Sequence, residues 1–162
     1  MERAGVRRNR MTEPDYLGSR EQSFRDFFKT CAALAAPGDG ALEPGSEGES
    51  KPILMAVLQT VLPFGHPRFP LSPGAMGEQF EALYSRKPGP AAAWRESLRV
   101  FNRTEGFAAV PAGALAALEP GARREYFWLW SQSAFALKRR FYRTCRGAIL
   151  ALAHGALPPA GP

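Results

Sequence analysis

Apolar residues recur along most of this chain at the three- and four-residue spacing of amphipathic helices. The first clear case predicts a helix from about Ser23 to Ala36. Ser23 and Asp26 stand three residues apart, as in a capping box, and Pro37 ends the pattern. The expected inward face of this helix consists of Phe24, Phe27, Phe28, Cys31, Leu34 and Ala35.

Three further helices follow in the middle of the chain. The first starts with Ser50 as N-cap and ends at Leu62, and it is apolar around most of its circumference, which predicts a central position in the core. Four prolines in residues 63–73 then predict a rigid corner without regular structure. Helices are expected from Pro73 and over Ala91–Asn102, with inward stripes of Met76, Phe80, Leu83 and Tyr84, and of Trp94, Leu98 and Phe101.

The last predicted helices are the most distinctive. Pro120 introduces the fifth, a break near residues 131–133 follows, and the sixth covers about Ala134–His154. At about 100° per residue, the arginines Arg139, Arg143 and Arg146 lie opposite an apolar face. That face consists of Leu137, Phe141, Cys145, Ala148, Ile149 and Leu152.

No strand-like alternation of useful length interrupts the helical pattern. The sequence therefore predicts an all-α fold, a compact orthogonal bundle of about five to six helices with Pro/Gly-rich connecting loops. We expect a flexible arm at residues 1–20, a single helical domain at 21–157 with an acidic Gly/Pro linker at 37–50, and a disordered tail at 158–162.

Charge is distributed unevenly along the 162 residues, although the formal net charge is +6. Residues 1–50 carry seven Lys/Arg against nine Asp/Glu, whereas residues 51–162 carry fourteen against six. Much of the basic excess lies on the last two helices, next to the aromatic block Tyr126–Trp130. Such a surface favours an acidic partner, although a positive helix face is equally often only solvated.

Catalytic and metal-binding patterns are missing from the sequence. His66, His154, Cys31 and Cys145 do not have the spacing of a zinc site, and the two cysteines are expected to be buried thiols. His66 lacks a neighbouring nucleophile or carboxylate and is interpreted as a residue that holds its loop by hydrogen bonding. No phosphate-binding Gly-rich loop or nucleophile elbow is present. The chain is therefore not expected to be an enzyme by itself.

Two segments resemble the gluconate 2-dehydrogenase subunit 3 family. They are the helix Ile53–Leu62 with the corner Pro63–Pro70, and the stretch from Phe107 that includes Arg123-Arg124-Glu125-Tyr126-Phe127-Trp128-Leu129-Trp130 and Arg139-Arg140-Phe141-Tyr142. The resemblance covers about residues 53–154. Proteins of this family are small helical subunits that accompany large flavin-dependent oxidoreductases of the glucose-methanol-choline (GMC) type.

The resemblance implies a non-catalytic small subunit that binds and stabilises a large FAD-dependent dehydrogenase or oxidase, or helps it to mature or reach its compartment. The chain itself would hold no cofactor, and FAD would belong to the partner subunit. The expected partner-binding residues are Tyr126, Trp128, Trp130, Arg139, Arg140, Arg143 and Arg146, since interfaces favour aromatic residues and arginine. Either tryptophan is a candidate anchor, and burial of both in this chain is the alternative.

Two other interpretations remain open at this stage. One is a basic helical module that binds nucleic acid through residues 138–146. The other is a small helical enzyme or ligand-binding protein with a site between the proline-rich corner and the last helix. No apolar run is long enough to span a membrane, and Arg7–Arg8 is not followed by the apolar region of an export signal. We therefore expect a cytoplasmic protein, or a periplasmic one if it is exported with its partner.

Overall fold

The computed structural model describes residues 13–36, 47–67, 69–85, 88–103 and 114–156. Within these ranges the chain forms six α-helices and one short 3-10 helix, with no strand apart from an isolated bridge between Arg103 and Ala114. This confirms the predicted all-α class. The elements are α1 (Glu13–Ala35), α2 (Glu47–Val61), α3 (Pro73–Ser85), α4 (Pro88–Asn102), η1 (Leu115–Ala117), α5 (Pro120–Gln132) and α6 (Ala136–Ala156).

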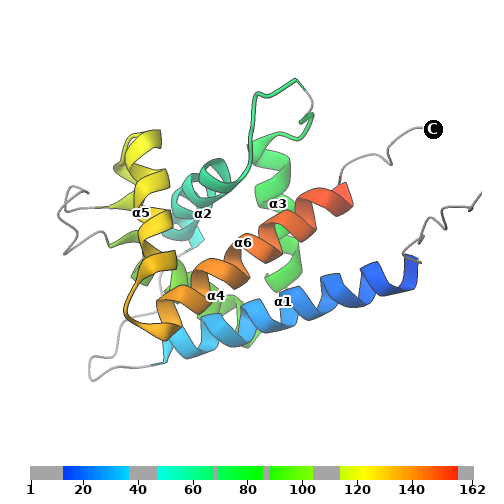
Figure 1. Cartoon of the computed structure of the whole chain (residues 1–162), viewed down its shortest axis with the longest axis horizontal. Coiled ribbons are helices and arrows are strands. Elements are labelled where there is room, and N and C mark those ends of the chain that lie inside the picture. Colours follow the sequence, from blue (N-terminus) through cyan, green and yellow to red (C-terminus); the bar gives the residue numbers. More distant parts are fainter. Residues whose placement is uncertain (1–12, 37–46, 68, 86–87, 104–113, 157–162) are drawn as a thin grey trace, which may run out of the picture.

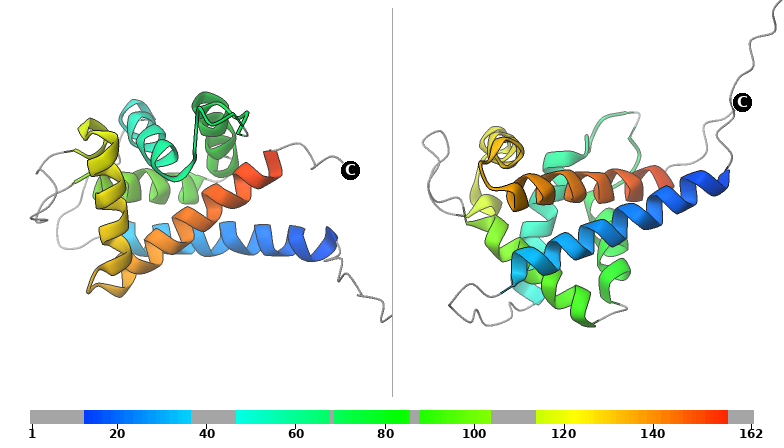
Figure 2. Two further views of the ribbon diagram at one scale, coloured as in Figure 1. Left: turned by 45° about the horizontal axis from the view of Figure 1, so that its top comes forward. Right: turned by 60° about the horizontal axis from the view of Figure 1, so that its bottom comes forward.

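The helices cross one another instead of running in parallel (Figure 1). The two longest, α1 and α6, lie side by side along one face, and α1 packs most extensively against α6 and α4. Helix α5 makes a steep angle with α6 at one end of the molecule (Figure 2). Helix α3 packs against α2, α4 and α6, and its Phe80 ring reaches Phe27 of α1. The first and last helices of the chain are therefore neighbours in the bundle and form one face of it together.

The core is dominated by aromatic rings in contact with each other. Phe27 of α1 lies at its centre, with ring centroids 5.8 Å from Phe80, 5.0 Å from Trp94 and 6.4 Å from Phe141. Phe141 is also 5.4 Å from Phe101. Phe141 thereby connects the aromatic rings around Phe27 to a second group of aromatic rings that packs against α5. Offset and edge-to-face ring pairs of this kind add about 0.5–1.5 kcal/mol each beyond the area they bury.

Most of the predicted inward positions are confirmed. Trp94, Leu98 and Phe101 of α4 are fully buried. So are Phe141, Cys145, Ala148 and Ile149 of α6, and Leu152 is nearly so, while Leu137 is half-buried. The amphipathic spacing was informative for these helices because each has one wide apolar stripe that another helix covers.

The starts of α1 and α2 differ most from prediction, while α4 begins three residues before the expected Ala91 and α6 two residues after the expected Ala134. Helix α1 begins at Glu13, so residues 13–20 belong to it and not to a flexible arm, and Ser23 lies inside the helix instead of capping it. Pro14 at the first helical turn, flanked by Glu13 and Asp15, is a favourable helix start. Helix α2 likewise begins at Glu47, which takes residues 47–50 out of the expected linker. The remaining arm, linker and tail positions, residues 1–12, 37–46 and 158–162, and residue 157 at the end of the predicted domain lie outside the described residues.

The start of α3 agrees with prediction. The Ser72 hydroxyl accepts a hydrogen bond from the backbone N–H of Ala75 at 3.2 Å, which satisfies one of the free donors at the helix start. In the preceding corner the backbone N–H of Phe69 donates to the carbonyl of His66 at 2.8 Å, and Gly65 takes a positive φ of 83°. Phe64 and Phe69 stack across the corner with centroids 5.5 Å apart.

Candidate functional site

Helix α5 places its aromatic residues on opposite sides. Glu119 precedes the helix with extended backbone angles and Pro120 occupies the first turn, so the start of the helix is fixed within a residue. Two residues of helix correspond to about 200° of rotation, which separates Trp128 from Trp130. Trp130 is 1% exposed, whereas 51% of Trp128 is exposed. Trp128 is therefore the tryptophan that is accessible to another molecule.

Tyr126 and Trp130 were expected on the partner surface, and the structure corrects this because both are buried. The Tyr126 hydroxyl lies 2.9 Å from the carbonyl oxygen of Phe101 and 2.8 Å from that of Arg103. It therefore holds the end of α4 against α5. Trp130 packs on Phe101 with ring centroids 4.5 Å apart. In this conformation both side chains support the fold and neither can contact a partner.

A second exposed aromatic residue lies in the turn between α5 and α6. Phe135 is 68% exposed, and its backbone N–H donates to the Ser133 hydroxyl at 3.2 Å. The Lys138 ammonium lies 5.6 Å from the Phe135 ring centroid and 5.2 Å from that of Trp130. The helical pattern did not single out Phe135, because this residue precedes the apolar stripe of α6 by two positions. Its place next to a predicted helix break was the available signal.

Arg139 has a different role from the one expected. Its guanidinium donates to the backbone carbonyl oxygens of Ser133 and Ala134, so it bends back over the turn before α6. The side chain is half-buried. Arg139 therefore stabilises the α5–α6 turn, and its donors are at least partly occupied there.

The other three predicted arginines are exposed but do not form one row. Arg140 and Arg143 line a groove of about 350 Å³ between α6 and α1, whereas Arg146 lies outside it. The remaining lining residues of this groove are Asp26, Lys29, Thr30 and Thr144. The basic surface of α6 is thus divided between a concave part shared with α1 and an exposed part.

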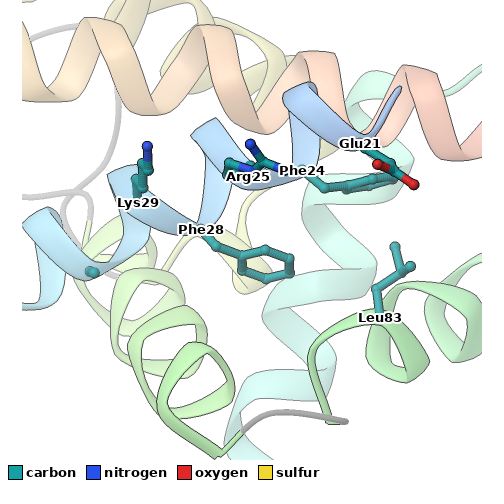
Figure 3. A pocket seen from close by; sticks show the side chains of 7 residues that line it. Glu21, Phe24, Arg25, Phe28, Lys29 and Leu83 are labelled. Carbon is teal, nitrogen blue, oxygen red and sulfur yellow. The ribbon is translucent and has the colours of Figure 1, made fainter. Parts of the chain in front are cut away.

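A larger cavity of about 550 Å³ adjoins this groove on α1 (Figure 3). Its apolar lining comes from Phe24, Phe28 and Ala32 of α1 and from Leu83 of α3. Arg25, Lys29 and Glu21 supply its charged residues. In Figure 3 the Phe28 ring and Leu83 face the space between α1 and α3, while Arg25 and Lys29 point the opposite way.

The two cysteines lie on the neighbouring helices α1 and α6, and both are buried free thiols, as predicted. Burial raises the pKa of the Cys31 thiol from 9.0 to about 12, partly offset by a hydrogen bond with Ser97. Burial also raises the pKa of Cys145 well above its ordinary value. Neither thiol is therefore an activated nucleophile in this fold.

Within the described residues, no group of three or more His, Cys, Asp or Glu side chains is arranged to hold a metal ion. Nor does any helix in these ranges have the length and apolar character needed to cross a membrane. The chain matches no protein-family model, and comparison with curated proteins and with solved structures gave no match.

Proposed function

We propose that this chain is a non-catalytic helical subunit that binds and stabilises a larger protein through the end of the molecule where α5 meets α6. Two exposed aromatic side chains there, Trp128 and Phe135, are the observation that carries the proposal. Trp128 belongs to α5 and Phe135 to the turn that follows it, and α5 lies at one end of the molecule (Figure 1).

The exposure of these rings is unusual for side chains of their size. Burying one large apolar side chain contributes about 1.5–3 kcal/mol, so leaving two in water forgoes a substantial stabilisation that a partner can supply. Tryptophan is also among the residues that most often dominate interface energetics, particularly when it enters a pocket of the partner.

The expected partner is a large FAD-dependent oxidoreductase of the GMC type. This part of the proposal rests on the resemblance of residues 53–154 to the small subunits of such enzymes. In this arrangement the larger subunit binds FAD and carries out the oxidation. The present chain supplies contacts that stabilise the larger subunit or assist its maturation or export.

The proposal is tested by tagging the chain in its native source, purifying it under mild conditions and recording an absorbance spectrum. We expect a larger polypeptide with a flavin spectrum to copurify. Trp128→Ala combined with Phe135→Ala should reduce the recovered flavoprotein by at least about tenfold, since two anchors of this kind contribute more than 1.4 kcal/mol.

Leu150→Ala is the matched control, because Leu150 is an exposed apolar residue (37%) far along α6 from Phe135. It should leave the yield of flavoprotein unchanged. The proposal is wrong if no flavoprotein copurifies. The assignment of the surface is wrong if the double variant and the control recover equal amounts.

A further inference from the structure

The groove between α1 and α6 collects positive charge from two helices. Lys29 comes from α1, and Arg140 and Arg143 come from α6. These helices pack against each other more extensively than any other pair described. The backbone positions of the three residues are therefore fixed by the packing of α1 on α6 and not by loops.

These cations have no carboxylate partner among the described residues. No ion pair joins Lys29, Arg140 or Arg143 to an acidic side chain within these ranges. Asp26 lines the same groove, but one of its carboxylate oxygens accepts a hydrogen bond from the Gln22 amide at 2.8 Å. The groove therefore retains an excess of positive charge, and like charges held close together disfavour the unliganded state.

Hydroxyl groups complete the lining. Thr30 and Thr144 donate to the backbone carbonyl oxygens of Asp26 and Arg140, at 2.8 and 2.9 Å. These bonds fix the two threonine side chains along the helices. The lining is thus mainly cationic, and the guanidinium groups offer the forked donors that match tetrahedral oxyanions.

We propose that this groove binds a phosphate group, held by Lys29, Arg140 and Arg143. A dianionic phosphate neutralises much of the excess charge. Its oxygens can also accept hydrogen bonds from more donors than the oxygens of a single carboxylate can. The volume of about 350 Å³ is at the small end of the range for ligand sites, roughly 300–1,000 Å³. The site does not depend on the proposed partner surface, since neither Trp128 nor Phe135 lines it.

Lys29 also lies at the edge of the larger cavity lined by Phe24, Phe28 and Leu83, although its ammonium points away from Phe28 and Leu83 (Figure 3). The phosphate site therefore adjoins an apolar groove, and two sources of the phosphate group fit the geometry. One is free inorganic phosphate or a polar phosphate ester. The other is an amphiphile whose alkyl chain lies along the apolar groove.

The test measures the binding of inorganic phosphate and of octyl phosphate by isothermal titration calorimetry, with sodium chloride at equal ionic strength as the reference. Lys29→Gln with Arg143→Gln should raise the dissociation constant for phosphate by at least about tenfold. Arg124→Gln with Arg146→Gln removes two exposed cations outside the groove and should leave it unchanged. Both double variants change the net charge equally. The comparison therefore distinguishes binding at the groove from general electrostatic attraction to a basic protein.

Phe28→Ala distinguishes the two sources. If octyl phosphate binds more tightly than inorganic phosphate and Phe28→Ala removes that gain, the natural ligand is amphiphilic. Equal dissociation constants assign the site to a free phosphate or a polar ester. Either result upholds the phosphate site. Absence of binding by the unaltered chain, or an equal loss in both double variants, would overturn it. Thermal unfolding of each variant without ligand checks that it is folded.

Discussion

At the scale of single residues, burial determines what each polar or ionisable group can do. Tyr126 and Cys31 show this clearly, because both lie in the core and each has a hydrogen-bonding partner that fixes its position. Burial raises the pKa of Tyr126 from 10.0 to about 12 and that of Cys31 from 9.0 to about 12. In both cases the neutral form is the one compatible with the fold.

A dependence of stability on alkaline pH follows. Both groups lose their protons in the unfolded chain before they do so in the folded chain, so the unfolded state gains from rising pH. The free energy of unfolding should be unaffected by these groups below pH 9.0 and should fall between pH 9.0 and about 12. Urea unfolding at a series of pH values measures it.

Tyr126→Phe provides the internal comparison. It removes one of the groups whose pKa is raised by burial and leaves Cys31 and Cys145, so its stability should decline less steeply than that of the unaltered chain between pH 10.0 and about 12. Its stability at neutral pH should be lower because the carbonyl oxygens of Phe101 and Arg103 lose their hydrogen-bond donor. Parallel curves for the two proteins over this interval would contradict the assignment to Tyr126.

Individual tryptophans and arginines of α5 and α6 also show what a sequence pattern leaves undetermined. Helical rotation places Trp128 and Trp130 on opposite sides of α5, but it does not reveal which of them faces the core. That choice depends on where α4 lies relative to α5, which is a property of the assembled bundle. Arg139 and Arg143 share one predicted face, yet one folds back on the turn while the other lines a groove with α1.

At the scale of the helices, apolar periodicity predicted their existence and inward faces better than their ends. The stripes of α4 and α6 consist of residues spaced by three and four, most of which are fully buried, and in α3 Met76 and Phe80 are fully buried while Leu83 is half-buried. The side chain of Tyr84, the last member of the α3 stripe, lies outside the described residues. The start of α1 was missed because residues 13–20 carry several charges and little apolar pattern. The groove between α1 and α6 was not predictable either, because sequence spacing does not reveal which distant helices become neighbours.

The turn between α5 and α6 depends on Arg139, and this predicts a structural effect of its removal. Arg139→Gln should lower the free energy of unfolding by about 1–2 kcal/mol, because the carbonyl oxygens of Ser133 and Ala134 lose charged donors. Arg146→Gln, an exposed position on the same helix, should change it by less than about 0.5 kcal/mol. Urea denaturation compares them. Equal effects would show that the contact does not stabilise the turn. Substitutions at Arg139 are consequently unsuitable for testing a partner interface.

At the scale of the whole molecule, one aromatic core connects helices from both ends of the chain. Phe27 of α1 contacts rings from α3, α4 and α6. Ser97 of α4, itself fully buried, lies 3.1 Å from the carbonyl oxygen of Cys31 and so links α4 to α1 as well. The N-terminal helix is therefore part of the core, as its predicted apolar face with Phe27 and Cys31 indicated, although the sequence did not show which helices it packs against.

This arrangement predicts that the chain unfolds cooperatively. It also predicts that replacing Phe27 lowers the free energy of unfolding strongly, whereas replacing Phe135 hardly changes it. Phe27→Ala should lower the free energy of unfolding by about 3–5 kcal/mol, since the cavity would open where four helices meet. Phe135→Ala should change it by less than about 0.5 kcal/mol, because that ring is largely in water.

Urea unfolding followed by tryptophan fluorescence and by far-ultraviolet circular dichroism should give coincident transitions for the unaltered chain. Separate transitions would show that α1 unfolds independently of the remaining helices. A large loss in the Phe135 variant would mean that this aromatic residue supports the fold, leaving Trp128 as the only exposed anchor for the proposed partner.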